Sequence, residues 1–301
     1  MRIVSLLPSA TEIVCALGLH EQLVGVTHEC DFPPPVKRLP KVTRTRIPVD
    51  ATSAAIDRRV DARLEAERGL YSLDREMLRS LRPDLIVTQT LCHVCAVPGA
   101  EVRAAADALP SGAAIVNLEP ETLTGVFAAI RQVAAAADAV QVAERLVEGL
   151  MRRVDTVVER SGRVESRPPT TLLEWLDPPF SCGHWNPELV RLAGGREALG
   201  AEGLPSRRLD WADVIRAQPE VICVACCGFT IERTLPDLGQ ARAAPGWSKL
   251  PAVRSGRVYV TDGSQYFSRP GPRLVDSLEI LAHALHPDTH PLPVHLAGEL
   301  V

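Results

Sequence analysis

Cysteines are the residues of this sequence whose spacing points most directly to chemistry. Cys92-His93-Val94-Cys95 allows two thiolates to bind one metal ion, or two thiols to form a disulfide. A thioredoxin-type motif would open a helix within a thioredoxin-like order of elements, which the sequence does not show. A structural zinc site usually has a second spaced pair nearby, whereas Cys226 and Cys227 are adjacent. The motif alone does not separate a functional role from a structural one.

The eight cysteines divide into two groups once the expected strands are drawn. Cys15 falls in an expected helix and Cys223 in an expected strand, where small apolar side chains fill the core. The other six follow expected strands, and one interpretation is a site for zinc or an iron–sulfur cluster. Its ligands would be Cys30, Cys92, Cys95, Cys226 and Cys227. The alternative is that these thiols, with Cys182, fill small apolar gaps.

Aromatic, histidine, serine and arginine side chains follow several of the same strands. They include Ser9, His28, Trp175, Phe180, His184, Trp185, Tyr266, Phe267 and Arg269. In open parallel sheets, ligands bind outside the carboxyl ends of the strands, so these residues are the candidates for binding a ligand. The alternative places the tryptophans and Phe180 in the core of a lobe. The histidines 283, 286, 290 and 295 are expected to be solvated.

Strands alternating with helices must position these loops. Residues 2–7 predict a buried strand, after which Ser9-Ala10-Thr11-Glu12 predicts a capping box and a helix that ends before Gly18. Further buried strands are expected at about 23–27, 85–87, 113–117, 172–175, 219–224 and 258–261.

A repeated junction indicates two similar halves. The segment from Leu81 to Val87 and the segment from Ala217 to Cys223 both place a proline and an acidic residue before an apolar strand. This repeat favours an α/β fold with two lobes, each built on a largely parallel sheet. The predicted domains are an N-terminal lobe (1–120), a linker helix (121–162) that is continuous or broken near Asp138, and a C-terminal lobe (163–301).

Composition excludes several classes of protein. The chain has 301 residues, of which 46% are hydrophobic and 23% charged, so two packed cores are expected rather than disorder. The net charge of −4 provides no basic excess for nucleic acid. No apolar stretch approaches the roughly 20 residues that span a bilayer, so no membrane insertion is expected. The apolar run at the N-terminus ends at Leu7, which is too short for a secretory signal and predicts a cytoplasmic location.

Several segments together resemble the cobalamin and iron-chelate substrate-binding proteins of ABC importers, especially the vitamin B12-binding branch. The similar segments are Ile3 to Glu12, Leu73 to Gln89, Gly183 to Leu189, Ala193 to Gly195 and Gly256 to Tyr259. The resemblance covers nearly the whole chain and implies two Rossmann-like lobes of the class III periplasmic-binding-protein type, joined by one long helix. These lobes would clamp a ligand with limited hinge motion. The loops at 177–180 and 266–273 resemble a cytosolic sub-branch without a signal.

The resulting hypothesis is a small-molecule binding protein that holds a corrinoid-like or metal-chelate ligand, such as cobalamin, between the lobes without catalysis. The aromatic candidates would supply flat apolar contact, Arg269 would pair with a carboxylate or phosphate, and His28 or His184 would supply an axial nitrogen. The resemblance makes an ABC permease a candidate partner. The alternative hypothesis is a cytosolic metalloprotein or enzyme that uses the cysteine-ligated zinc or iron–sulfur site.

Overall fold

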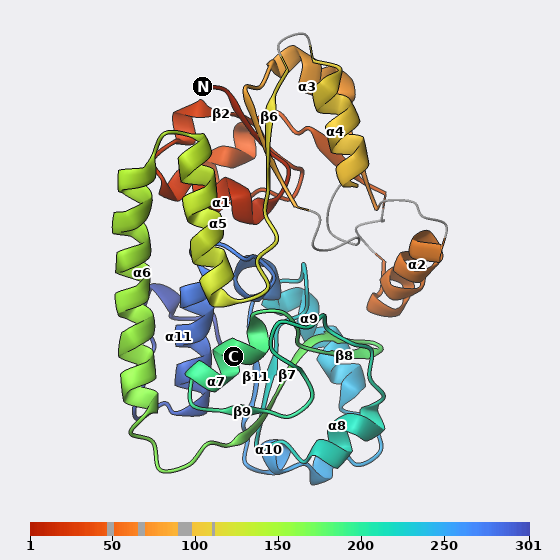
Figure 1. The fold of residues 1–301 in the computed structure, drawn as a ribbon. Helices are drawn as coiled ribbons and strands as arrows, with labels where there is room; N and C mark the ends of the chain where they lie inside the picture. Colours follow the sequence, from red (N-terminus) through yellow and green to blue (C-terminus); the bar gives the residue numbers. More distant parts are fainter. Residues whose placement is uncertain (47–50, 66–69, 90–97, 110–111) are drawn as a thin grey trace. The chain divides into compact units, whose positions relative to one another are not determined.

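The chain folds into two compact units. The computed structural model describes residues 1–46, 51–65, 70–89, 98–109 and 112–301. Unit 1 comprises Met1–Pro120 and Thr124–Glu148, and unit 2 comprises Glu121–Leu123 and Gly149–Val301. Each unit contains its own sheet with helices packed around it (Figure 1). The predicted α/β fold with a largely parallel sheet in each of two lobes is therefore confirmed.

The sheet of unit 1 contains four parallel strands in the order β2-β1-β5-β6. They are β1 (Ile3–Ser5), β2 (Leu23–Gly25), β5 (Leu85–Thr88) and β6 (Ala114–Asn117). Among the described helices of this unit are α1 (Pro8–Ala16), α2 (Ser53–Glu65), α3 (Arg75–Leu81) and α4 (Gly99–Asp107). A separate antiparallel pair joins β3 (Thr43–Thr45) to β4 (Tyr71–Leu73).

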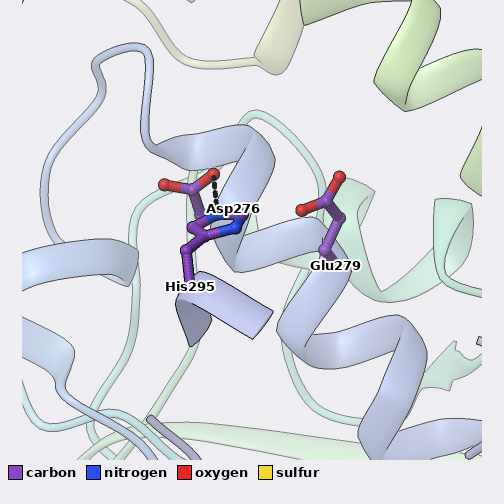
Figure 2. A group of neighbouring side chains, drawn as sticks. All are labelled: Asp276, Glu279 and His295. Atoms are coloured by element: carbon purple, nitrogen blue, oxygen red, sulfur yellow. Dashed lines mark ion pairs between the residues drawn. The ribbon is translucent and has the colours of Figure 1, made fainter. Parts of the chain in front are cut away.

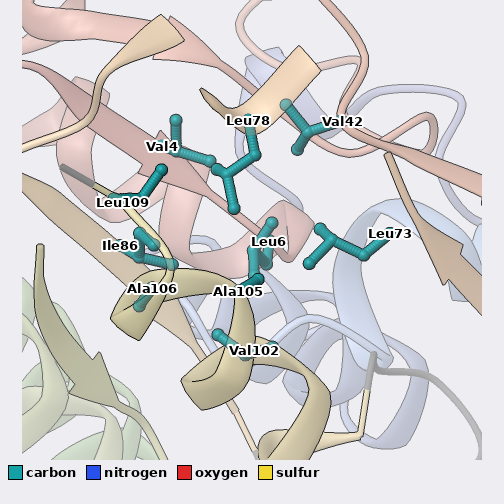
Figure 3. Close-up of a cluster of buried hydrophobic side chains, with 10 residues drawn as sticks. All are labelled: Val4, Leu6, Val42, Leu73, Leu78, Ile86, Val102, Ala105, Ala106 and Leu109. Atoms are coloured by element: carbon teal, nitrogen blue, oxygen red, sulfur yellow. The ribbon is translucent and has the colours of Figure 1, made fainter. Parts of the chain in front are cut away.

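An apolar cluster holds the elements of unit 1 together. Figure 3 shows side chains from β1, β5, α3 and α4 meeting in one core with Val42 and Leu73. Strands β1 and β5 are buried along their whole length, as expected for central strands covered on both faces. This packing fixes the loops that follow these strands.

The predicted capping box at the start of α1 was wrong. The helix begins at Pro8, and Leu7 occupies the N-cap position without a side-chain cap. Proline at the first helical position has the required φ and lacks an N–H that would need a partner, so no serine cap is necessary. The predicted end is confirmed, because Gly18 has a φ of +76° and its N–H bonds to the carbonyl oxygen of Cys15 at 3.0 Å.

The sheet of unit 2 has three parallel strands, β7 (Pro169–Leu176), β10 (Val221–Val224) and β11 (Val258–Val260), in the order β11-β10-β7. Two short strands share the other edge of β7: β9 (Arg196–Glu197) pairs with its start, and antiparallel β8 (Pro179–Ser181) with its end. The helices of this unit are α7 (Asn186–Leu192), α8 (Trp211–Ala217), α9 (Ile231–Ala241), α10 (Pro251–Arg254) and α11 (Leu274–Leu285).

The junction repeated in the sequence has the same structure in both units. Arg82 ends α3 with a φ of +44°, and Gln218 ends α8 with a φ of +47°. The backbone N–H of the acidic residue in each junction then donates to a carbonyl oxygen at the start of the neighbouring central strand. Asp84 donates to Arg2 and Glu220 donates to Pro169, each at 2.8 Å. The similarity inferred from seven residues therefore extends to strand placement.

The predicted linker, residues 121–162, contains two helices. They are α5 (Leu123–Ala136) and α6 (Val140–Ser161), and Asp138 between them has a φ of +54°. This left-handed conformation ends α5, because a continuing helix requires negative φ. The linker contributes residues to both units. Among the described residues, no helix is long and apolar enough to cross a membrane.

Candidate functional site

A row of aromatic side chains with an arginine at each end lies at the carboxyl end of β7 in unit 2. Trp175 on β7 pairs with Phe180 on β8. The ring of Trp175 contacts that of Phe229, with centroids 4.7 Å apart. The Arg233 guanidinium lies 4.7 Å from the Phe229 ring centre, and that of Arg208 lies 5.6 Å from the Phe180 ring centre. We call Arg208, Phe180, Trp175, Phe229 and Arg233 the aromatic–arginine row.

This row combines apolar surface with positive charge. Trp175 and Phe180 are half-buried, Phe229 is buried, and both arginines are exposed. The Trp175 indole donates to the carbonyl oxygen of Asp177 at 3.1 Å, which fixes the orientation of its ring. A flat apolar ligand with anionic substituents has the chemistry that matches such a surface, because the rings supply contact area and guanidinium groups pair with carboxylates.

A buried hydrogen-bond network supports the loop that carries His184 and Trp185. A carboxylate oxygen of Glu174 accepts the Gly183 N–H at 3.0 Å and the Asn186 amide at 2.7 Å. The Trp185 indole, itself buried, donates to the carbonyl oxygen of Phe267 at 2.9 Å. Burial raises the pKa of Glu174 to about 7, against the hydrogen bonds that favour its charged form.

The second loop of unit 2 is a π-helical turn, Gly263–Phe267, that follows β11. Asp262 precedes it and accepts the N–H of Gln265 at 2.7 Å and its side-chain amide at 2.9 Å. The predicted ligand residues of this region are largely enclosed: Phe267 is 0% exposed, and Tyr266 and Arg269 are each 6% exposed. These three side chains therefore lie beneath the exposed surface of the loop.

The start of the π-helical turn packs directly against the end of β10. A Cβ at Gly263 would lie 2.2 Å from the carbonyl oxygen of Cys226 and 2.5 Å from the backbone of Ala225. This contact requires glycine because backbone atoms cannot move aside as the end of a flexible side chain can.

We therefore expect Gly263→Ala to lower the free energy of unfolding by about 2 kcal/mol, the usual cost of overpacking a close backbone contact. Gly239→Ala is the matched control, because Gly239 lies in α9 and a Cβ there meets nothing within 4 Å. That variant should be neutral or up to about 1 kcal/mol more stable, since alanine favours a helix. Urea unfolding of both variants checks the expectation, and equal effects would contradict it.

In unit 1, His28 follows β2 and its ring is oriented by two neighbours. Its Nδ1 lies 2.8 Å from the Thr43 hydroxyl, and its ring meets that of Tyr71 edge-on with centroids 4.9 Å apart. The Tyr71 hydroxyl donates to a carboxylate oxygen of Glu29 at 2.6 Å. Burial lowers the pKa of His28, which favours the neutral imidazole that binds metals. Ser9, the other candidate of unit 1, is buried in α1.

Most of the thiols that the structure describes are buried, and burial favours their protonated form. The sulfur of Cys30 lies 3.0 Å from the hydroxyl of Thr11, and its thiol donates to the hydroxyl of Thr27 at 3.8 Å. Burial also raises the pKa of Cys30 and that of Cys226. Cys227 is exposed, and Cys92 and Cys95 lie outside the described residues. The cysteine metal site stays a prediction, and Cys30 and Cys226 have the burial expected of thiols that fill the core.

One cluster of possible metal ligands occurs in the described part of the chain, and none of its members is a predicted site residue. Figure 2 shows Asp276 and Glu279 on α11 and His295 on a following segment. Both carboxylates already bind Arg153 of α6: its Nη2 lies 2.5 Å from Asp276 and 2.7 Å from Glu279. Because the guanidinium compensates their charge, we assign this cluster a structural role.

Histidine placement corrects one expectation. The prediction that all four C-terminal histidines are solvated was wrong, because His290 is 3% exposed. Its Nε2 lies 3.1 Å from the hydroxyl of Ser161, and its carbonyl oxygen lies 2.8 Å from Nδ1 of His283. His283 and His286 are half-buried, and His295 is exposed.

Several residues of the site were missed in the sequence. Arg233 lies in the first turn of α9, and Phe229 lies just before this helix. Phe229 follows an expected strand as the chosen candidates do, which was an available signal. Thr43 and Tyr71 had no local signal, because the β3–β4 pairing brings them beside His28.

Comparison with known proteins identifies the family of this chain and several similar proteins. The model of the periplasmic binding protein family matches residues 3–264. An uncharacterized ABC transporter substrate-binding lipoprotein of Bacillus subtilis is 25% identical, over 96% of this chain and 81% of its own. The vitamin B12-binding protein of Vibrio cholerae is 24% identical, over 92% and 86%. The periplasmic haem-binding protein of Roseiflexus sp. RS-1 in its apo form superposes with a TM-score of 0.71 and 25% identity, over 96% and 98%.

Proposed function

Because the chain belongs to the periplasmic binding protein family, we propose that it is a non-catalytic binding protein for a planar metal chelate, a corrinoid or a haem, that serves an ABC permease. The aromatic–arginine row carries the proposal, since it offers ring surface flanked by two guanidinium groups. The relatives that bind vitamin B12 or haem support the choice of ligand class.

The proposed contacts follow from the geometry of the row. The rings of Trp175 and Phe180 are accessible and would contact the face of the macrocycle, as burial of aromatic and macrocyclic surface is favourable. Arg208 and Arg233 would pair with carboxylates or amides at its periphery. Trp185, Tyr266, Phe267 and Arg269 are buried, so they would support the neighbouring loops rather than contact the ligand.

Two histidines remain candidates for the axial nitrogen of the bound metal. The Thr43 hydroxyl orients the ring of His28 through Nδ1. In metal-binding histidines, a hydrogen bond to the ring nitrogen that does not bind the metal fixes the orientation of the ring in this way. His184 stacks beside Trp185 with centroids 5.6 Å apart, and burial lowers its pKa. A lowered pKa favours the neutral imidazole, the form that binds a metal, at both positions. The cytoplasmic location stays a prediction alongside this proposal.

The experiment is a titration of the purified protein with hemin and with cyanocobalamin, followed by absorption and tryptophan fluorescence. We expect binding of one of the two at micromolar concentration, and Trp175→Ala should weaken it about tenfold or more, the effect of removing a central aromatic anchor. Trp211→Ala is the matched control, because Trp211 on α8 also packs on one aromatic ring, Trp247 at 5.5 Å, outside the row. The control should bind within twofold of the wild type.

Two outcomes would contradict the proposal. The absence of any spectral or fluorescence change with either ligand would exclude both members of the ligand class. Binding that is weakened equally in Trp175→Ala and Trp211→Ala would show that the row is not the contact surface. Circular dichroism of both variants distinguishes lost contact from lost folding.

A further inference from the structure

The last residues of the chain contact both the helices and the sheet of unit 2. We call residues 287–301 the C-terminal segment. At its start, His290 is buried against Ser161 at the end of α6. Further on, His295 lies 3.6 Å from Asp276 of α11 (Figure 2), and Leu296 is completely buried. These contacts attach the segment to two helices before it reaches the sheet.

The end of this segment extends the sheet at β11. The N–H of Val260 donates to the carbonyl oxygen of Val301 at 2.7 Å, and the N–H of Val301 donates back to Val260 at 3.0 Å. Thr261 and Leu300 form an antiparallel bridge. Since β11 is the outer strand of the order β11-β10-β7, the segment covers the exposed edge of the sheet immediately before the π-helical turn begins.

One side chain of the segment reaches the turn itself. Glu299, half-buried, is hydrogen-bonded to the hydroxyl of Tyr266. The Arg273 guanidinium lies 5.3 Å from the centre of the same Tyr266 ring, and its Nη1 donates to the side-chain oxygen of Gln265 at 3.2 Å. Glu299 also faces Asp262, the residue that caps the turn. The carboxylate thus accepts a hydrogen bond from the Tyr266 hydroxyl and lies close enough to Asp262 and Arg273 to interact with their charges.

We propose that the C-terminal segment orders the loop wall of the ligand site, with Glu299 as a positioning residue that holds Tyr266 through its hydroxyl. Without this acceptor, the Tyr266 hydroxyl loses its hydrogen-bond partner, and the turn that ends at Phe267 loses its outer attachment. The predicted effect on ligand binding rests on the proposed function. The ordering of Tyr266 by Glu299 does not, because it requires no ligand.

Fluorine NMR tests the ordering directly. The chain contains three tyrosines, so 3-fluorotyrosine labelling gives a spectrum of three signals, and Tyr266→Phe assigns one of them. In Glu299→Ala, the Tyr266 signal should shift and broaden, while the signal of Tyr71 in unit 1 stays unchanged. Val301→Pro, which removes the Val301 N–H from the ladder with β11, should affect the same signal. Glu299→Gln retains an acceptor oxygen and should restore most of the wild-type line shape.

Ligand affinity tests the consequence. Glu299→Ala should weaken binding of hemin or cyanocobalamin about five- to tenfold, as expected when a hydrogen bond that orders a site is lost, and Glu299→Gln should recover most of it. Glu165→Ala, an exposed glutamate between α6 and β7, is the control and should bind as the wild type does.

The outcomes separate this inference from the proposed function. An unchanged Tyr266 signal in Glu299→Ala would overturn the inference whatever the ligand data show. A shifted signal with unchanged affinity would overturn the claim that the segment orders the ligand site. If the wild type binds neither ligand, the proposed function and the consequence for binding both fail, and the fluorine spectra still decide whether Glu299 orders Tyr266.

Discussion

Arg153→Ala is expected to lower the free energy of unfolding by about 2–3 kcal/mol, one of the two largest effects that the structure predicts. Arg153 donates from Nε and Nη2 to Glu279 and from Nη2 to Asp276. The side chains of these two carboxylates are only 15% and 11% exposed. Removing the guanidinium leaves two poorly solvated negative charges side by side on α11, and this uncompensated charge accounts for most of the expected loss.

A second arginine on the segment after α6 provides the matched control. Arg163 is paired with Glu159, and both side chains are largely exposed, at 74% and 69%. Exposed ion pairs contribute about 0–1 kcal/mol, so Arg163→Ala should change the free energy of unfolding by less than about 0.5 kcal/mol. Urea unfolding of both variants at pH 7 makes the comparison. Equal losses would show that burial of the carboxylates does not determine the effect.

The second large effect is a stability that falls as the pH rises, produced by Glu174. Burial is the first cause that raises the pKa of this carboxyl to about 7, and the neighbouring charge of Glu197 adds to it. The usual pKa of a glutamate in an unfolded chain is near 4.5. Between these two values the unfolded chain has lost the proton while the folded protein retains it.

The folded protein therefore binds more protons than the unfolded chain over this range, and its stability decreases as the pH rises from about 4.5 to about 7. Below this range both forms are protonated, and above it the full loss remains. The expected loss from this one group is roughly 2 kcal/mol, reduced from the full pKa difference because the residue is only partly buried.

Glu174→Gln isolates this contribution. Glutamine keeps an oxygen that accepts the Gly183 N–H and the Asn186 amide but does not ionise, so the variant should be more stable than the wild type at pH 8 and about equal at pH 4.5. Glu220→Gln, an exposed glutamate before β10, is the control and should keep the slope of the wild type. Free energies of unfolding measured from pH 4.5 to 8 test this expectation. It would be contradicted if the stability of Glu174→Gln fell with pH as steeply as that of the wild type.

The sequence was most informative where a local pattern decides a structure. Short apolar runs predicted the central strands, and the repeated proline-acid junction predicted that β5 and β10 have equivalent positions in two similar units. Asp210 and Asp213, three positions apart, form a capping box at the start of α8. These features depend on residues within a few positions of one another, so the sequence contains the information.

The site was less predictable, because its contacts join residues that are far apart in the chain. Strand pairing brings Tyr71 to His28, and the loop after β10 brings Phe229 to Trp175. Burial is also decided by packing: Phe267 and His290 looked like loop residues that face ligand or solvent, and tertiary contacts enclose both. No local pattern reports how much of a side chain its distant neighbours will cover.

The sequence by itself thus determined the α/β fold, the two-unit organisation and the family, because periodicity, caps and repeated junctions are local and the similar segments extend over most of the chain. Only the tertiary structure decided which aromatic rings stay accessible, which carboxyls change their pKa and where the C-terminal segment attaches. These outcomes depend on desolvation and on contacts between residues that are distant in the chain, such as Glu174 with Asn186, His28 with Tyr71 and Val260 with Val301. Such contacts exist only once the chain has packed.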